Sequence, residues 1–437
     1  MSQSRDASLA ILGGRPAIKR KFQIHNTYGR EEIRAAKKVI KSGVLSKFLG
    51  SASPDFFGGP RVLELERIAE QTFGTKHAIA VNSWTSGLVA AVGAIGIEPG
   101  DEVIVTPWTM SATVAAILHW SAIPIFVDID PISYNLDPLK IHASISPRTK
   151  AIMVADIFGM SANVDAIMKI AHDHSLKVIS DTAQSPGATY KDSVAGTIAH
   201  IGGISLNYHK HIHTGEGGIL FTNDDELALR LKLIRNHAES VVEGMQINNL
   251  QNMIGYNFRL GEIEAALAIE QIKKLPRILK RKIRSANLLT VELAEIPSLR
   301  IPNVEKGSSH VYYVYPIALD SNELGISRKT LVAALRAEGI PALVEGYQNI
   351  HLLPLFEKKI AFGAKGFPWS LNENSNFSYQ YHRGMCPVAE ELHDRSFIGI
   401  GLTGLDLRDT DIKAIGFAFK KVWRHLHELR EIDSRTI

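Results

Sequence analysis

The chain of 437 residues contains a single cysteine, Cys386, and no long apolar run. One cysteine excludes an intrachain disulfide framework, a cysteine-rich zinc site and an iron–sulfur cluster held by four thiolates of this chain. We therefore expect no metal centre of these kinds and a reducing, cytoplasmic location. No segment reaches the roughly 18 uninterrupted apolar residues of a membrane span, and residues 1–11 lack the apolar core of a secretion signal.

Excess charge of one sign is also missing. Lys and Arg number 49 against 45 Asp and Glu, a net charge of +4 that is too small to indicate nucleic acid as the main partner. Hydrophobic residues make up 45% of the chain, enough to bury a sizeable core. At about 150 residues per domain, the length predicts two to three domains, or one large domain with an appendage.

Short apolar runs rich in Val and Ile alternate with helical patterns between residues 76 and 223. Runs that hardly alternate with polar residues are typical of strands buried on both faces, and strand–helix alternation predicts a mostly parallel sheet. Seven strands are expected, at 78–83, 102–107, 123–130, 150–158, 177–181, 202–207 and 218–222, with helices at 86–95, 112–120, 138–145 and 163–174. Such sheets bind ligands at the carboxyl ends of their strands.

The rest of the chain predicts an appended smaller unit. A helical stretch over 260–295 contains Pro276, which should break or kink it. The pattern then predicts a strand at 310–319 and helices at 327–338 and 410–429. We expect an N-terminal arm and helix at 1–60, a large domain at 61–295 and a small α/β domain at 296–437.

Lys210 follows a predicted strand and precedes the glycine-rich turn 215–218. A lysine in this position suits a Schiff-base nucleophile, whose amine must be neutral and therefore needs a pKa lowered by desolvation or by nearby cations. The alternative is a surface lysine before a hairpin turn, and the segment alone does not choose between them.

Asp181 ends an apolar strand and Gln184 follows three residues later. A carboxylate at a strand end can pair with a protonated pyridine nitrogen and keep it charged, which makes pyridoxal phosphate an electron sink. Gln184 could then hydrogen-bond a ring hydroxyl. The alternative for Asp181 is a cap on a following helix.

Residues 82–87 lie between a predicted strand and a predicted helix and include Trp84 and Thr85. Backbone N–H groups at a helix N-terminus, with hydroxyls beside them, bind phosphate. Ser205 has a hydroxyl able to reach the same phosphate. The alternative is an ordinary helix cap.

Together, the three elements resemble the sugar aminotransferases of the DegT/DnrJ/EryC/StrS type, from about Gly43 to the C-terminus. The resemblance implies aspartate-aminotransferase fold type I: a seven-stranded, mostly parallel sheet flanked by helices, plus a smaller C-terminal α/β domain. Matching stretches begin at Gly58, Gly100, Val127, Asp181, Gly215 and Gly255, the last running to Arg259.

By this resemblance, Lys210 forms the Schiff base with pyridoxal 5'-phosphate and moves a proton in the pyridoxal and pyridoxamine 5'-phosphate halves of a ping-pong reaction. Asp181 holds the pyridinium, Gln184 contacts the ring oxygen, and the phosphate lies on Trp84 (mainly its backbone), Thr85 and Ser205. Asn257 occupies a position that reaches the phosphate of the neighbouring subunit, which implies a homodimer with shared active sites. Its alternative is a helix cap before Arg259.

Three features depart from the family pattern. Trp84 stands where glycine is frequent, which changes the side-chain crowding near the phosphate. Met110 stands where an aromatic ring commonly stacks on the cofactor, and Trp108 is expected to compensate. Lys210 is flanked by His209, His211 and His213, one of which could bind a substrate phosphate or carboxylate; the alternative is that they only pack or meet solvent.

Substrate contacts are expected from His209 and, in the smaller domain, from four residues whose alternative is ordinary packing: His310, Tyr312, Tyr347 and His351.

The resemblance implies amino transfer from L-glutamate to a keto-sugar, a nucleotide-linked one being favoured, in polysaccharide or secondary-metabolite biosynthesis. Relatives that act as sugar 3-dehydratases carry His in place of Lys210, and some add an iron–sulfur cluster, so Lys210 and the single cysteine favour amino transfer. A dehydratase, an aminotransferase for a free keto-cyclitol, and a regulatory protein without turnover stay open as alternatives.

Overall fold

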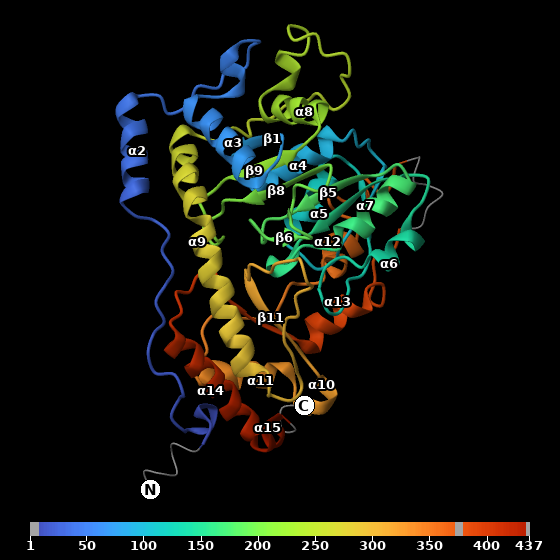
Figure 1. Cartoon of the computed structure of the whole chain (residues 1–437). Helices are drawn as coiled ribbons and strands as arrows, with labels where there is room; N and C mark the ends of the chain where they lie inside the picture. The colour runs from blue at the N-terminus through green and yellow to red at the C-terminus, as the bar shows by residue number, and fades with distance from the viewer. Residues whose placement is uncertain (1–7, 372–378, 434–437) are drawn as a thin grey trace.

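The computed structural model describes residues 8–371 and 379–433 (Figure 1). Residues 1–7, which open the predicted N-terminal arm, lie outside this range. Across the described part, none of the helices combines the length and apolar character that a membrane span requires.

The centre of the fold is a seven-stranded sheet in the order β1-β9-β8-β5-β4-β2-β3. The pairs β2–β3, β2–β4, β4–β5 and β5–β8 are parallel, whereas β9 runs antiparallel to both β1 and β8. This confirms the prediction of a mostly parallel sheet. The strands are β1 (His77–Val81), β2 (Glu102–Val105), β3 (Ile123–Phe126), β4 (Thr149–Ala155), β5 (Lys177–Asp181), β8 (Ile201–Ser205) and β9 (Gly218–Thr222).

Helices cover both faces of this sheet because nearly every strand residue is apolar and must be buried on each side. One face packs on α4 (Trp84–Ala94), α5 (Ser111–His119) and α8 (Asp225–Arg235). The other face packs on α7 (Val164–Asp173), on α3 (Pro60–Phe73) and on the first half of α9 (Glu262–Leu293). The predicted helix at 138–145 is a short α6 (Pro138–Ile141) that continues as a 3-10 turn.

A second, antiparallel sheet follows in the order β10-β11-β13-β12. Its strands are β10 (Leu299–Arg300), β11 (Val314–Leu319), β12 (Leu343–Val344) and β13 (Phe397–Gly401), and it packs on α11 (Arg328–Ala337) and α14 (Asp409–Arg424). The predicted terminal helix is divided at His425 into α14 and α15 (Leu426–Asp433).

Helix α9 joins the two sheets and runs along most of the molecule (Figure 1). It contacts α2 (Arg30–Ser42) and α3 at one end and α14 at the other. Pro276 lies inside α9, which is continuous over 32 residues, so the predicted break at this proline is wrong, whereas the predicted kink stays a prediction. Proline removes one backbone donor, and packing on neighbours at both ends compensates. The division at residues 60 and 295 stays a prediction.

Candidate functional site

A cavity of about 190 Å³ lies at the carboxyl ends of the parallel strands, where such sheets bind ligands. Its walls come from the start of α4, the start of α5, the end of β5, and β8 with the loop that follows it. It brings together nine of the predicted site residues: Trp84, Thr85, Met110, Asp181, Gln184, Ser205, His209, Lys210 and Tyr347.

Lys210 is held in the turn after β8, where its backbone N–H donates to the carbonyl of Asn207 at 3.0 Å. Burial lowers the pKa of its amine from 10.5 to about 8, although the nearby charge of Asp181 acts in the opposite direction. The Nζ atom lies 4.5 Å from the ring centroid of Tyr313. An aromatic face attracts the ammonium form, so this contact does not lower the pKa, and burial is what allows the amine to lose its proton close to neutral pH.

Asp181 ends β5 with a buried carboxylate. Oδ1 accepts hydrogen bonds from the indole Nε1 of Trp84 at 2.6 Å and from the backbone N–H of Ala183 at 3.2 Å. Oδ2 accepts one from the hydroxyl of Thr113 at 2.7 Å. No helix begins after this strand, so the alternative of a helix cap is wrong for Asp181. Its side-chain donors come from α4 and α5 instead.

The predicted phosphate turn forms the N-terminus of α4 at the cavity wall. Ser83 caps the helix, since its Oγ accepts from the backbone N–H of Ser86 at 3.0 Å. Trp84 is the residue expected to change the side-chain crowding near the phosphate. Its indole reaches inward to Asp181 and is buried. Ser205 lines the same cavity and accepts from the Asn207 N–H at 3.2 Å.

Gln184 and two tyrosines form a hydrogen-bonded group beside Lys210. Gln184 accepts from the Phe158 N–H at 2.9 Å and donates from Nε2 to the Tyr347 hydroxyl at 3.0 Å. The side chains of Tyr313 and Tyr347 are hydrogen-bonded to each other, and burial raises the pKa of Tyr313 to about 12. The sequence did not single out Tyr313 or Thr113, because only the fold brings them into contact with Lys210 and Asp181, respectively.

The methionine and tryptophan expected at the cofactor ring separate in space. Met110 lines the cavity at the start of α5, with 57% of its surface exposed. Trp108 is fully buried and its Nε1 donates to the backbone carbonyl of Tyr347 at 2.5 Å. Trp108 therefore supports the wall behind Tyr347, and the cavity lining contains Met110 alone of the two.

Of the three histidines around Lys210, His209 alone lines the cavity. Burial and the adjacent Lys210 lower its pKa to about 4, so its imidazole is neutral at physiological pH. His211 is fully buried with Nε2 2.9 Å from the Val311 carbonyl oxygen. His213 lies against Tyr28, with ring centroids 4.9 Å apart.

Three predicted substrate residues lie outside the cavity lining. The His310 ring stacks on Tyr312 with centroids 4.0 Å apart, and its Nδ1 accepts from the Tyr312 N–H at 3.0 Å. His351 is fully buried, and its Nε2 lies 2.9 Å from Oε1 of Glu390. These contacts are the ordinary packing that the sequence left open, and the geometry lends no support to substrate binding by this trio.

Asn257 is exposed and also lies outside the cavity of its own chain. Its carbonyl accepts from Asn82 Nδ2 at 3.2 Å, and its Oδ1 accepts from Arg259 Nε at 2.7 Å. The cap of α9 is Gly261, so the alternative of a helix cap is wrong for Asn257.

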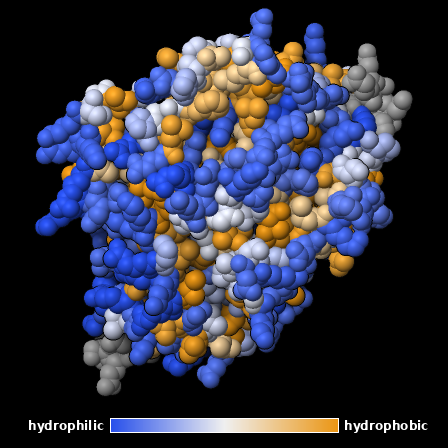
Figure 2. Space-filling view, turned by 45° about the horizontal axis from the view of Figure 1, so that its top comes forward, coloured by the Kyte–Doolittle hydropathy of each residue, from blue (hydrophilic) through white to orange (hydrophobic). Residues whose placement is uncertain are grey.

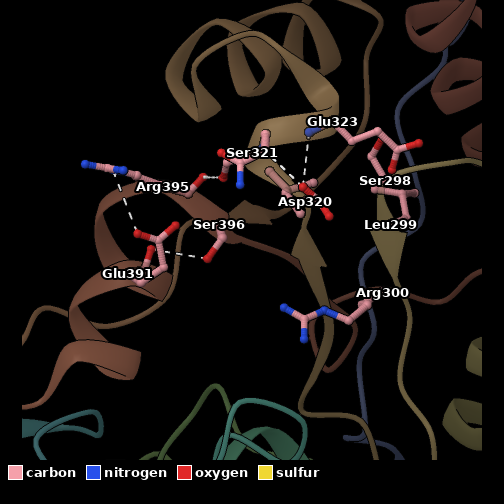
Figure 3. Close-up of a pocket in the computed structure, with 11 residues that line it drawn as sticks. Ser298, Leu299, Arg300, Asp320, Ser321, Glu323, Glu391, Arg395 and Ser396 are labelled. Carbon is pink, nitrogen blue, oxygen red and sulfur yellow. Dashed lines mark hydrogen bonds and ion pairs between the residues drawn. The ribbon is translucent and has the colours of Figure 1, made fainter.

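A larger hollow of about 550 Å³ lies beside the small sheet (Figure 3). Three of its charged groups already have structural partners: Asp320 caps a short helix through the N–H groups of Asn322 and Glu323, and Arg395 pairs with Glu391 at 3.8 Å. None of the predicted site residues lines it. The chemistry therefore places the functional site at the smaller cavity.

The donor set of that cavity fits pyridoxal phosphate. It combines an amine of lowered pKa, a buried carboxylate at a strand end, and a helix N-terminus with the hydroxyls of Thr85 and Ser205 beside it. Asn207 also lines the cavity, and its buried Oδ1 has no hydrogen-bond partner among the described residues.

Comparison with known proteins agrees with this reading. The DegT/DnrJ/EryC1/StrS aminotransferase family model matches residues 31–377. The spore coat polysaccharide biosynthesis protein SpsC of Bacillus subtilis is 33% identical over 79% of this chain and 87% of its own length. The GDP-perosamine synthase of Caulobacter vibrioides is 34% identical over 68% and 78%, respectively. The L-glutamine:2-deoxy-scyllo-inosose aminotransferase of Streptoalloteichus tenebrarius is 31% identical over 97% and 99%.

Solved structures agree as well. An aminotransferase from Psychrobacter cryohalolentis superposes with a TM-score of 0.80 at 27% identity, covering 93% of this chain and all of that one. The sheet order, the cavity chemistry and these matches confirm the resemblance found in the sequence. The chain thus belongs to the DegT/DnrJ/EryC1/StrS aminotransferase family and is a pyridoxal-phosphate-dependent transaminase of fold type I.

Proposed function

We propose that this enzyme transfers an amino group from L-glutamate to the keto group of a nucleotide-linked sugar in the cytoplasm. The single observation that carries the proposal is that Lys210 and Asp181 line one cavity at the carboxyl ends of the parallel strands. Two relatives support the substrate class by their names, since one makes GDP-perosamine and the other acts in polysaccharide biosynthesis.

The residues divide the work by their chemistry. Bound pyridoxal phosphate supplies an electron sink that makes the Cα–H of an amino acid acidic. Asp181 pairs with the ring nitrogen, Gln184 orients the ring, and the N-terminus of α4 with Ser205 holds the phosphate. The Nζ of Lys210 accepts the Cα proton and returns it, which a lysine of lowered pKa can do near neutral pH.

We further propose a homodimer in which Asn257 of each subunit reaches the phosphate site of the other. Asn257 is exposed, and large apolar side chains near the cavity and the 250–257 segment are exposed too: Met110 at 57%, Tyr208 at 69% and Ile254 at 65%. Figure 2 shows apolar patches between hydrophilic regions on one face of the chain. A partner that covers such surface would bury it from water.

Mixing variants tests the shared site. Lys210→Ala and Asn257→Ala should each be impaired as homodimers. A mixed dimer restores one complete site, which combines the wild-type lysine of one subunit with the wild-type asparagine of the other. Activity that rises on mixing supports the shared site, whereas activity equal to the average of the two variants contradicts it.

Amination of a free keto-cyclitol is a second candidate, because the inosose aminotransferase matches this chain over almost its full length. Purified enzyme should therefore be incubated with glutamate, cofactor and either nucleotide-linked ketosugars or keto-cyclitols. An amino group on the recovered acceptor, formed together with one equivalent of 2-oxoglutarate, identifies transamination and its substrate. A dehydratase that takes its electrons from glutamate would release ammonia and leave a deoxy sugar without an amino group, and a regulatory protein would bind cofactor without any half-reaction.

The control for this assay is a matched pair of lysine variants. Lys210→Ala should lose both the visible absorbance band of the bound cofactor and amino transfer. Lys191→Ala removes an exposed lysine that pairs with Asp165 at 2.7 Å and should leave both unchanged. A Lys210→Ala protein that keeps its band and its turnover would refute the assignment.

A further inference from the structure

The Asp181 carboxylate is held from the protein side by two side-chain donors, the indole of Trp84 and the hydroxyl of Thr113, at 2.6 and 2.7 Å. They come from the first turn of α4 and the first turn of α5, so each carboxylate oxygen is fixed by a different helix. Both donors are buried, with exposed fractions of 6% for Trp84 and 0% for Thr113. Because both side chains are buried, little water can reach the carboxylate and replace either donor.

The indole is seated by a glycine on the neighbouring strand. Gly203 on β8 is the register partner of Asp181 on β5, and a Cβ on Gly203 would lie 2.5 Å from the Trp84 ring. A side chain at position 203 would therefore displace the Trp84 ring. Because Gly203 has no side chain, there is space next to Asp181 for the flat indole, whose N–H points at Oδ1.

From this geometry we infer that Trp84 and Thr113 are positioning residues that keep Asp181 a pairing anion rather than a proton acceptor. The inference rests on the proposed pairing of Asp181 with the ring nitrogen of the cofactor. Donors to a carboxylate stabilise its charged form and reduce its basicity. The proton of the pyridine nitrogen then stays on the ring, where it sustains the electron sink.

Loss of either donor makes the carboxylate more basic and draws that proton toward Asp181. A ring with less positive charge withdraws fewer electrons, so the Schiff-base nitrogen at Lys210 holds its proton to higher pH. The other ionisable groups that act on or lie near Asp181 are Lys210, Asp156 and Tyr347, and the variants below leave all three in place.

The test is a pH titration of the visible absorbance band of the cofactor-loaded enzyme. Trp84→Phe keeps a flat ring in the space next to Asp181 and removes the N–H, and Thr113→Val removes the hydroxyl at nearly constant shape. Each should raise the pH midpoint of the band by about one unit, a roughly tenfold change in the proton equilibrium. The half-reaction with glutamate should slow by a similar factor.

Two matched variants separate this role from packing. Trp120→Phe also deletes an indole donor against α4, in this case from a partly buried ring, but its partner is the carbonyl of Val89 at 2.7 Å rather than Asp181. Thr113→Ser retains the donor. Both should keep the wild-type midpoint. A midpoint unchanged in Trp84→Phe and Thr113→Val, or moved equally by Trp120→Phe and Thr113→Ser, overturns the inference.

Failure of the proposed function would look different. If Asp181→Asn leaves the midpoint of the band unchanged, or Lys210→Ala retains the band, the pairing itself is wrong. If those two variants behave as expected while Trp84→Phe and Thr113→Val match the wild type, the assignment of Asp181 and Lys210 stands. Only the positioning role of Trp84 and Thr113 is then refuted. Should Trp84→Phe fail to fold, the Thr113→Val and Thr113→Ser pair decides by itself.

Discussion

The amine of Lys210 should capture the cofactor at a rate set by its lowered pKa. Burial moves that pKa from 10.5 to about 8. At pH 7 an amine with a pKa of 8 is about one-tenth neutral, whereas one at 10.5 is neutral in roughly one molecule in 3,000. The protein therefore raises the concentration of the reactive form roughly 300-fold at neutral pH, and only the neutral form attacks an aldehyde.

Stopped-flow absorbance measures this directly. Enzyme stripped of cofactor is mixed with pyridoxal phosphate between pH 7 and 10, above the range near pH 6 in which the phosphate itself titrates. The association rate should rise about fivefold from pH 7 to pH 8, less than about twofold from pH 8 to pH 9, and then become level. A rate that still rises steeply between pH 9 and 10 would refute the desolvation of Lys210.

The same pKa shift affects stability, and its sign can be worked out. Because the folded pKa lies below the unfolded one, the folded chain binds this proton less tightly, and the amine destabilises the fold at every pH below about 8. The penalty is at most about 3 kcal/mol, decreases between pH 8 and 10.5, and vanishes above. Lys210→Met should therefore raise the free energy of unfolding of the cofactor-free enzyme at pH 7, and by much less at pH 10. Urea denaturation at both values measures it, and an equal gain at both would attribute the effect to packing.

Two more outcomes follow from buried polar contacts. Glu66→Gln should lower the free energy of unfolding by about 3 kcal/mol in urea titrations, because the fully buried Arg235, whose Nη1 lies 2.5 Å from Glu66, would lose its counter-charge; a change below 1 kcal/mol would contradict this. Tyr347→Phe should reduce kcat/KM for amino transfer roughly tenfold while the cofactor band persists, since Gln184 Nε2 loses its acceptor; unchanged steady-state kinetics would argue against the contact.

Sequence reasoning located the site because its residues follow buried strands. The runs that end at Asp181 and Ser205 are apolar on both faces, so the sheet and its carboxyl edge could be predicted, and polar residues just beyond that edge had to meet there. Lys210 and the turn at Trp84 also follow predicted strands, so their position at this edge could be predicted in the same way. For these positions, local pattern and tertiary location are linked by the topology of a parallel sheet.

Other features could not be predicted because they depend on how distant elements pack. Tyr313 reaches the Lys210 amine only because the segment before β11 folds back over the large sheet. The direction of the Trp84 indole depends on a glycine 119 positions later in the chain. His310 and His351 are polar residues of the right type, but nothing in a single sequence tells a buried, paired histidine from one that faces a ligand.

Lys210 and Asp181 are both buried at this cavity, although the reaction requires opposite charge states of them. Desolvation disfavours both an ammonium and a carboxylate, yet the chemistry needs a neutral lysine and a charged aspartate. The difference lies in the partners: Asp181 receives hydrogen bonds from an indole, a hydroxyl and a backbone N–H, whereas the Lys210 amine faces the ring of Tyr313. The three donors offset the cost of burying the Asp181 carboxylate. The Tyr313 ring is a weaker partner for the Lys210 ammonium than a carboxylate would be, so burial still lowers the pKa of the amine. The charge states that this site requires therefore depend on the residues around Lys210 and Asp181, namely Trp84, Thr113 and Tyr313, as well as on Lys210 and Asp181 themselves.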